Sequence, residues 1–368
     1  MDFGGINPVI LIAGLMATAV PILLAALGET VVERSGVLNL GVEGMMVIGA
    51  LGGFVTAVHT GSPALGFLGG AVAGALLSLI FAALTQVFLA NQVATGLALT
   101  LFGLGVSSLG GQGYNGIKPP HTPGLLPEAL AGIPVAGPIL FGHDWVVYFS
   151  IAMTALVWWV LKATRIGLII RAVGESHDSA HALGYKVNRI RLLCILFGGA
   201  MAGIGGAYVS LARVPQWVDG ITAGAGWIAL AIVVFASWRP WRVLAGAYFF
   251  GGIGALQLNV QVSGGIPLGI LGLIALVCGA ILAVGLLRRS TPERPQMHPA
   301  AVAVLAVPPL AWVVGLAMGL TQIKVPVEYL SMAPFVLTIV VLVIMSSGRG
   351  KAATGAPASL GQNFHASR

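Results

Sequence analysis

The chain has 368 residues, of which 57% are hydrophobic and only 8% are charged. This composition argues against a soluble or disordered protein and favours a membrane protein, because about 20 consecutive apolar residues cross a bilayer. The net charge of +7 would suit a nucleic-acid partner only if it formed a basic patch, and it is spread along the chain instead.

About eleven apolar runs are long enough, or nearly so, to span a membrane. They cover residues 7–27, 42–58, 64–89, 93–110, 145–163, 192–212, 222–236, 243–259, 267–287, 300–320 and 329–346. The runs are continuous, whereas the strands of a transmembrane β-barrel would alternate. The sequence therefore predicts an all-α, polytopic bundle with one transmembrane domain over residues 1–346. Residues 347–368 are polar and rich in Gly, Ala and Ser, which predicts a disordered cytoplasmic tail.

Basic residues fall mainly in every second segment between these runs. Only Lys118, Arg213 and Lys324 of the 18 Lys and Arg residues lie in the other segments. The positive-inside rule then places the N-terminus outside and the C-terminus inside, with an odd number of spans. Residues 111–144 become the longest outside segment, and residues 162–191 become the longest inside segment.

The segment 28–46 concentrates polar groups in a chain that otherwise avoids them. Among its glycines it holds Glu29, Glu33, Arg34, Asn39 and Glu43. Polar groups at membrane depth are costly and usually functional, and non-helical backbone there must be buried in protein or line a watery cavity. On these residues alone two interpretations stay open: an ordinary loop between spans, or a break in a helix on a transport pathway.

The inside segment contains a predicted short helix over Ser176–Leu183. The Ser176 side chain can cap its first turn, Asp178 favours the positive end of the helix dipole, and Gly184 is a natural stop. Two turns are too few to be stable in water, so this helix needs a surface on this protein or on another one. A well-capped connecting loop is the alternative. We expect no metal site at His177 and His181, since no third ligand lies near them.

No phosphate-binding loop, serine elbow or zinc-protease motif occurs in the sequence. We therefore expect neither enzymatic activity nor a cofactor in this chain. Uphill transport would have to draw on an ion gradient or on a separate ATPase.

The stretch from Glu29 to Met46 resembles the hallmark of ATP-binding-cassette importer permeases, in the branch that serves simple sugars and nucleosides. That branch is related to the ribose and branched-chain amino-acid permeases. Residues 91–100, 171–208 and 220–261 fit the same family in the same order. The resemblance covers roughly residues 7–260 and a piece near 324–364. The chain between these parts departs from the family pattern, which predicts a two-span insertion at residues 267–320.

The resemblance implies a permease subunit in the inner membrane of a bacterium. Its implied partners are a second, related permease in a heterodimer, a cytoplasmic ATPase that uses the ATP, an exported solute-binding protein and membrane lipid. Nucleic acid is not among them. The implied substrate is a nucleoside or a simple sugar. Another small solute such as a branched-chain amino acid stays an alternative, as do an ion-coupled secondary transporter and a non-transporting scaffold.

Glycine-interrupted segments in the two halves of a transporter point to its pathway, and here they are residues 36–44 and 220–226. We expect Glu43 in the first turn of a broken helix, with Asn39 at the break. Helix capping would explain Asn91 and Gln92 equally well. The candidate pathway residues are Asn39, Glu43, Asn91, Gln92, Thr222 and Trp227. The candidate ATPase-coupling residues are Gly174, Glu175, Ser176, Asp178, Ala182, Leu183 and Gly184.

Overall fold

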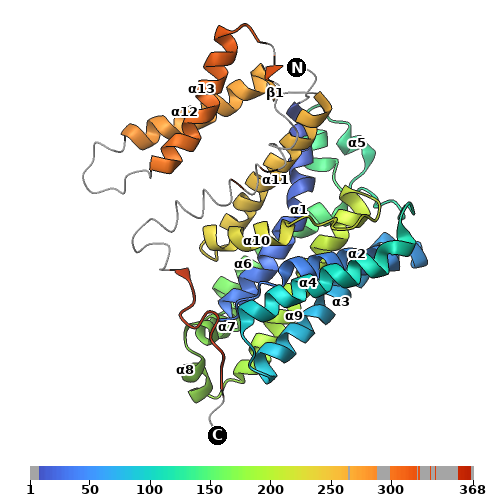
Figure 1. Ribbon diagram of the computed structural model, residues 1–368, viewed down its shortest axis with the longest axis vertical. Helices are drawn as coiled ribbons and strands as arrows, with labels where there is room; N and C mark the ends of the chain where they lie inside the picture. The colour runs from blue at the N-terminus through green and yellow to red at the C-terminus, as the bar shows by residue number, and fades with distance from the viewer. Residues whose placement is uncertain are drawn as a thin grey trace. The chain divides into compact units, whose positions relative to one another are not determined.

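The computed structural model describes residues 8–263, 266–287, 299–320, 322–323, 332, 336 and 355–365. These residues are mostly helical (Figure 1). The α-helices are α1 (Pro8–Arg34), α2 (Val42–Thr60), α3 (Pro63–Ala82), α4 (Gln92–Gly111), α5 (Glu128–Ala131), α6 (Trp145–Ala163), α7 (Arg165–Glu175), α8 (His177–Ala182), α9 (Val187–Tyr208), α10 (Ala225–Phe235), α11 (Pro240–Ser263), α12 (Leu268–Leu287) and α13 (Pro299–Ala317). Shorter turns of π- or 3-10 helix are η1 (Ala83–Val87), η2 (Gln112–Tyr114), η3 (Gly137–Phe141) and η4 (Val209–Arg213).

Seven of the described helical segments are long and apolar enough to cross a membrane. They are Val9–Arg34, Val42–Thr60, Pro63–Val87, Gln92–Tyr114, Trp145–Ala163, Val187–Arg213 and Pro240–Gln261. The expected run 222–236 contains only the shorter helix α10, whereas runs 267–287 and 300–320 correspond to α12 and α13. Most of the last run, 329–346, lies outside the described residues. The structure thus confirms a polytopic helical protein, and the count of eleven spans stays a prediction.

The chain divides into two compact units. The smaller unit contains residues 1–15, 128–142 and 252–352. Its helices α12 and α13 pack together, and strands β1 (Ile266–Pro267) and β2 (Gln322–Ile323) pair antiparallel. The larger unit contains residues 16–127, 143–251 and 353–368 and holds all the candidate site residues.

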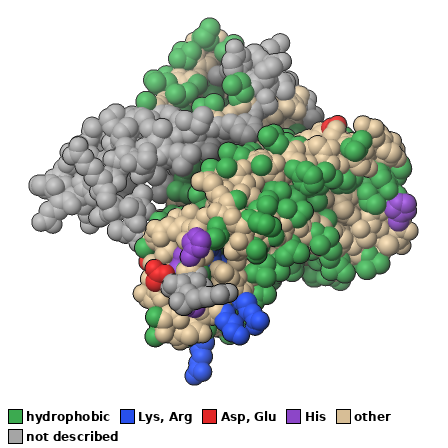
Figure 2. Space-filling model, turned by 60° about the horizontal axis from the view of Figure 1, so that its bottom comes forward, with side chains coloured by type: hydrophobic (Ala, Val, Ile, Leu, Met, Phe, Trp, Pro, Cys, Tyr) green, Lys and Arg blue, Asp and Glu red, His purple; other side chains and the backbone are tan. Residues whose placement is uncertain are grey.

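Helices α2, α3 and α9 form the centre of the larger unit, where small residues allow close contact. A Cβ atom on Gly49 of α2 would lie 2.3 Å from Cα of Gly203 on α9, so a larger residue would push these helices apart. Outside this centre, hydrophobic side chains cover a broad face of the molecule, while the Lys and Arg side chains visible in Figure 2 gather at one end. This surface is typical of a bundle in lipid.

Two helices of the larger unit start partway along the bundle. Gly44, in the first turn of α2, packs on Leu99 and Thr100, which lie near the middle of α4; its added Cβ would be 2.6 Å from the Leu99 carbonyl oxygen. Helix α10 has 11 residues and so spans only about 16 Å, roughly half of a bilayer core. Non-helical backbone precedes each helix, at residues 35–41 and 214–224. The structure thus has non-helical backbone before α2, as its glycines predict, and the interpretation of this segment as a break within a span stays a prediction.

Candidate functional site

The two interrupted segments meet at the carboxylate of Glu43. Its Oε1 accepts hydrogen bonds from Thr222 Oγ1 at 2.5 Å and from the Gly224 amide at 3.0 Å, and its Oε2 accepts one from the Gly226 amide at 2.7 Å. The Glu43 side chain is only 4% exposed. The amides of residues 224 and 226 belong to the start of α10, where the helix dipole favours a negative charge.

A close backbone approach makes this junction possible. A Cβ atom on Gly226 would lie 2.6 Å from both N and Cα of Glu43, so only glycine fits there. Glu43 also lies in the first turn of α2, as the sequence predicts. The Glu43 side chain therefore links the start of α2 to the start of the shorter helix α10, although 179 residues separate Glu43 from Thr222 in the chain.

Asn39 lies in the break before α2 and is fully buried. Its backbone amide donates to Glu29 Oε1 at 3.3 Å, its Nδ2 donates to Glu29 Oε2 at 3.4 Å, and its Oδ1 accepts from the Gly41 amide at 3.0 Å. These bonds satisfy polar groups that a break in a helix leaves unpaired. Asn39 thus tethers the non-helical segment to α1.

The remaining predicted pathway residues have different environments. Asn91 is exposed and caps α4, since its Oδ1 accepts from the Ala94 amide at 3.0 Å. Gln92 is buried, and its Oε1 accepts from the Leu38 amide at 2.8 Å. Trp227 directly follows the junction and is 37% exposed. The structure therefore joins Glu43 and Thr222, ties Gln92 to the segment with Asn39, and gives Asn91 a capping contact.

Helix α8 bears the predicted caps. The Ser176 hydroxyl accepts from the Ser179 amide at 3.2 Å, and Gly184 has a φ of +87°. His177 and Ala180 lie on the buried face of the helix, while Asp178, Ala182 and Leu183 are exposed. The sequence reasoning missed the preceding helix α7, whose Gly174 packs directly on the end of α1: an added Cβ would be 2.2 Å from the Arg34 carbonyl oxygen.

The C-terminal segment, residues 355–365, supplies the surface that the short helix requires. Phe364 is 6% exposed and packs with Val173, Ala180 and Val187, and its ring also contacts His177 and His181. Figure 1 draws this red segment beside α7 and α8.

Polar contacts fasten the same C-terminal segment to other parts of the larger unit. The Ser359 amide donates to the Gly174 carbonyl at 2.9 Å, and the Gly361 amide donates to the Gly36 carbonyl at 3.1 Å. The Gln362 carbonyl accepts from Gln92 Nε2 and from the Arg191 guanidinium, both at 3.1 Å. The prediction of a disordered tail is therefore wrong for residues 355–365, because composition could not reveal these long-range partners. Phe364, a lone aromatic in a polar tail, was the available signal.

His177 lies at the centre of this packing. The side chain is 5% exposed and its Nε2 has no hydrogen-bond partner. Burial, followed by the nearby Arg191 guanidinium, lowers the pKa of His177 to about 4, against a smaller opposing effect of Asp178. His177 is thus neutral at physiological pH.

Comparison with known proteins identifies the family. The family described as the branched-chain amino acid transport system / permease component matches residues 11–262. The chain belongs to this permease family. It is therefore an integral membrane protein that acts as the permease component of a transport system, as the resemblance predicted.

Individual relatives point to the sugar and nucleoside branch. The guanosine ABC transporter permease protein NupQ of Bacillus subtilis is 34% identical over 258 residues, covering 66% of this chain and 80% of NupQ. The nucleoside ABC transporter permease protein NupC of Lactococcus lactis is 34% identical over 254 residues, which cover 66% of this chain and 80% of NupC. TsgC13 of Haloferax volcanii, an ABC transporter permease protein named for glucose, is 44% identical over 248 residues, 66% of this chain and 75% of TsgC13. No solved structure matches the chain.

Proposed function

We propose that this permease imports a nucleoside or a simple sugar as one subunit of an ATP-binding-cassette transporter. The observation that carries the proposal is the junction at Glu43, where α2 and the half-length helix α10 begin side by side. Helices that start within the membrane are typical of substrate sites in transporters. The names of NupQ, NupC and TsgC13 support the substrate class.

In this proposal Glu43 shapes the pathway rather than binding the solute. Its oxygens already accept three hydrogen bonds from the protein, so a substrate would have to displace one of them. Trp227 is the better contact residue, since its half-exposed ring directly follows the junction. An aromatic face with few polar groups suits a base or a sugar ring. An ion-coupled transporter would instead need carboxylates free to exchange an ion.

Energy for transport comes, in this proposal, from an ATPase partner that docks on the exposed face of α8. Leu183 is 75% exposed and Tyr185 is 38% exposed, so the tip of this segment presents apolar surface to a partner. Its inner face is fixed by α7, α9 and residues 355–365. We assign Gly174, Glu175, Ser176, Asp178, Ala182, Leu183 and Gly184 to the coupling segment. In this proposal the chain needs no cofactor of its own.

The same proposal sets the remaining partners and the topology. A solute-binding protein delivers the substrate on the side opposite to the ATPase, and a second permease completes a heterodimer. The charge distribution supports an outside N-terminus, an inside C-terminus and eleven spans, with residues 267–320 as a two-span insertion in a single transmembrane domain.

Uptake by the assembled complex in proteoliposomes tests this function. With ATP on the ATPase side and binding protein on the other, we expect accumulation of a radiolabelled nucleoside or of glucose. Uptake should cease without binding protein or with a non-hydrolysable ATP analogue. A pH or sodium gradient that drives full uptake without ATP would contradict the proposal and favour the secondary transporter. Accumulation of leucine alone would keep the mechanism and overturn the substrate class.

A further inference from the structure

A basic pocket lies where three membrane helices of the larger unit begin or end. It has a volume of about 560 Å³ and is lined by residues at the ends of α1 and α6, by α7, and by the turn from α10 into α11. Five of its ten lining residues are cations, namely Arg34, Lys162, Arg171, Arg239 and Arg242, and none is acidic. Such a concentration of positive charge favours an anionic ligand.

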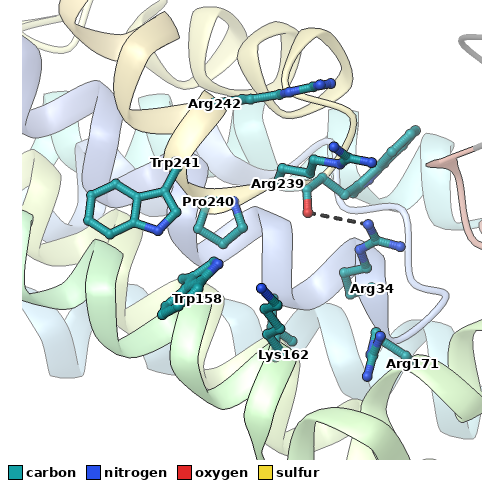
Figure 3. Close-up of a pocket in the computed structure, with 10 residues that line it drawn as sticks. Arg34, Trp158, Lys162, Arg171, Arg239, Pro240, Trp241 and Arg242 are labelled. Carbon is teal, nitrogen blue, oxygen red and sulfur yellow. Dashed lines mark hydrogen bonds between the residues drawn. The ribbon is translucent and has the colours of Figure 1, made fainter.

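Aromatic side chains place this pocket at the level of lipid headgroups. Trp158 and Trp241 are 37% and 43% exposed, and their ring centroids are 6.3 Å apart. Lys162 Nζ lies 5.1 Å from the Trp158 ring centroid. Figure 3 shows both indoles on one side of the pocket, with Lys162 beside them. Tryptophan beside Lys and Arg at the end of a span is typical of the membrane interface.

The wall of the pocket is a strained turn held by specific bonds. Ser237 and Trp238 have φ values of +51° and +55°, which are unfavourable for residues with side chains. The indole Nε1 of Trp238 donates a hydrogen bond to Glu33 Oε2 at 2.5 Å. The backbone carbonyl of Trp238 accepts one from the Arg34 guanidinium at 3.4 Å, which is the dashed line in Figure 3. Helix α11 starts in this turn at Pro240, so its dipole adds positive potential. The pocket is therefore built into the fold.

An apolar pocket of about 200 Å³ adjoins the basic one at Leu161, which lines both. Its other lining residues are hydrophobic side chains of α1, α6, α7 and α9, among them Val157 and Phe197. A site with a cationic part and an apolar part matches the two chemistries of one phospholipid molecule. A free phosphate or a soluble anion would use only the cationic part.

We propose that this pocket binds the headgroup of an anionic phospholipid from the surrounding membrane. The cations hold the phosphate, Trp158 and Trp241 pack against the glycerol region, and an acyl chain lies along α6. The bound lipid links the turn before α11 to α1 and α7, so it steadies the ends of the helices that flank the coupling segment. This site is independent of which solute the permease carries.

Native mass spectrometry of the assembled complex during delipidation tests the site. We expect phosphatidylglycerol to be retained in preference to phosphatidylcholine. The double variant Lys162→Gln/Arg239→Gln should lower the affinity for phosphatidylglycerol roughly ten-fold or more, because each basic residue near a membrane contributes to anionic-lipid binding. Arg189→Gln removes an exposed cation that does not line the pocket and should leave the affinity unchanged.

Three results of this experiment would overturn the proposal: equal retention of both lipids, an unchanged affinity in the double variant, or tight binding of glycerol phosphate alone, which would mean a soluble-anion site.

If the double variant does not assemble, the wild-type complex still provides a test. Phosphatidylglycerol with a photoreactive group near its headgroup should label peptides containing residues 158–162 and 238–242. Labelling confined to other peptides would contradict the assignment, and an adduct of this turn with an acidic partner protein in place of lipid would assign the pocket to that protein.

Discussion

Three donors converge on the Glu43 carboxylate, from Thr222, Gly224 and Gly226. Hydrogen bonds to a buried charge are worth about 1.5–3 kcal/mol each, and a donor left unpaired costs a similar amount. The neighbouring glycine at 226 leaves no room for adjustment. A single side chain thus determines how the starts of α2 and α10 meet.

Thr222→Val should destabilise the protein by about 1.5–3 kcal/mol, because it removes the hydroxyl donor to Glu43 while keeping the side-chain shape. Glu43→Gln should lower the stability further, because the NH₂ group of the glutamine cannot accept a hydrogen bond from the backbone amides that face it. We expect lower thermal midpoints in detergent and reduced uptake for both variants. Thr222→Ser keeps the hydroxyl and serves as the control. Wild-type stability and uptake in Glu43→Gln would show that the junction does not matter.

We expect the packing of α8 to depend on pH through His177. Its pKa is about 4 in the folded protein and about 6.5 in an unfolded chain. The unfolded state therefore binds more protons between these values, and the packing weakens as the pH falls from about 6.5 to about 4. Arg191 and Asp178 are the charged groups that influence this site.

Hydrogen exchange of residues 177–183, corrected for the intrinsic rate, should accelerate at pH 5 relative to pH 7.5. His177→Gln cannot gain a charge and should remove most of this difference. His181→Gln changes an exposed histidine of the same helix and should retain the difference between pH 5 and pH 7.5. The same pH response in wild type and His177→Gln would refute this role of His177.

The elements around α8 illustrate what local sequence can and cannot predict. Ser176 and Gly184 define the ends of the short helix through contacts within a few residues, so the capping pattern alone located it. The non-helical segment before α2 was likewise indicated by its glycines and polar residues. By contrast, Phe364 meets Val173 and Ala180 across about half the chain, and the polar composition of the tail indicated disorder. Glu43 and Thr222 were both selected as pathway residues, but their direct bond depends on the tertiary fold.

Phe364→Ala should release the C-terminal segment from α7 and α8. Burial of this ring is the main apolar contact of the segment, and truncation of a buried phenylalanine typically costs about 3–5 kcal/mol. We expect faster hydrogen exchange in residues 177–183 and 355–365 with little change in α2 and α3. His365→Ala alters an exposed neighbour and is the control. Unchanged protection of α8 would mean that α8 does not depend on this segment.

For the whole molecule, the distribution of charge predicts which segments lie on each side of the membrane. The capped helix α8 and the basic pocket both belong to segments that the charge bias places inside, whereas residues 111–144 are expected outside. Partners, lipid and solute would therefore meet the permease at different levels of the membrane.

Single cysteines test this orientation. In a Cys194→Ala/Cys278→Ala background, Gly124→Cys and Ser179→Cys introduce thiols at exposed positions in the two long segments. An impermeant thiol reagent applied to intact cells should label position 124 and not position 179. Permeabilised cells should show labelling at both positions. Labelling of position 179 in intact cells would reverse the topology.

Helix α8 is the element that we propose couples an ATPase to the pathway, and Gly184 offers the most direct test of that role. Its φ of +87° suits glycine, and an added Cβ would meet no atom within 4 Å, so a substitution acts through backbone strain of about 1–3 kcal/mol. Gly184→Val should displace the end of α8, whereas Gly184→Asn tolerates this backbone conformation.

ATPase rate and substrate uptake should be measured together in proteoliposomes that contain the assembled complex and loaded binding protein. We predict that Gly184→Val loses uptake and no longer increases its ATPase rate in response to binding protein, while Gly184→Asn behaves nearly as wild type. Wild-type stimulation and wild-type uptake in Gly184→Val would contradict the role of α8 in coupling.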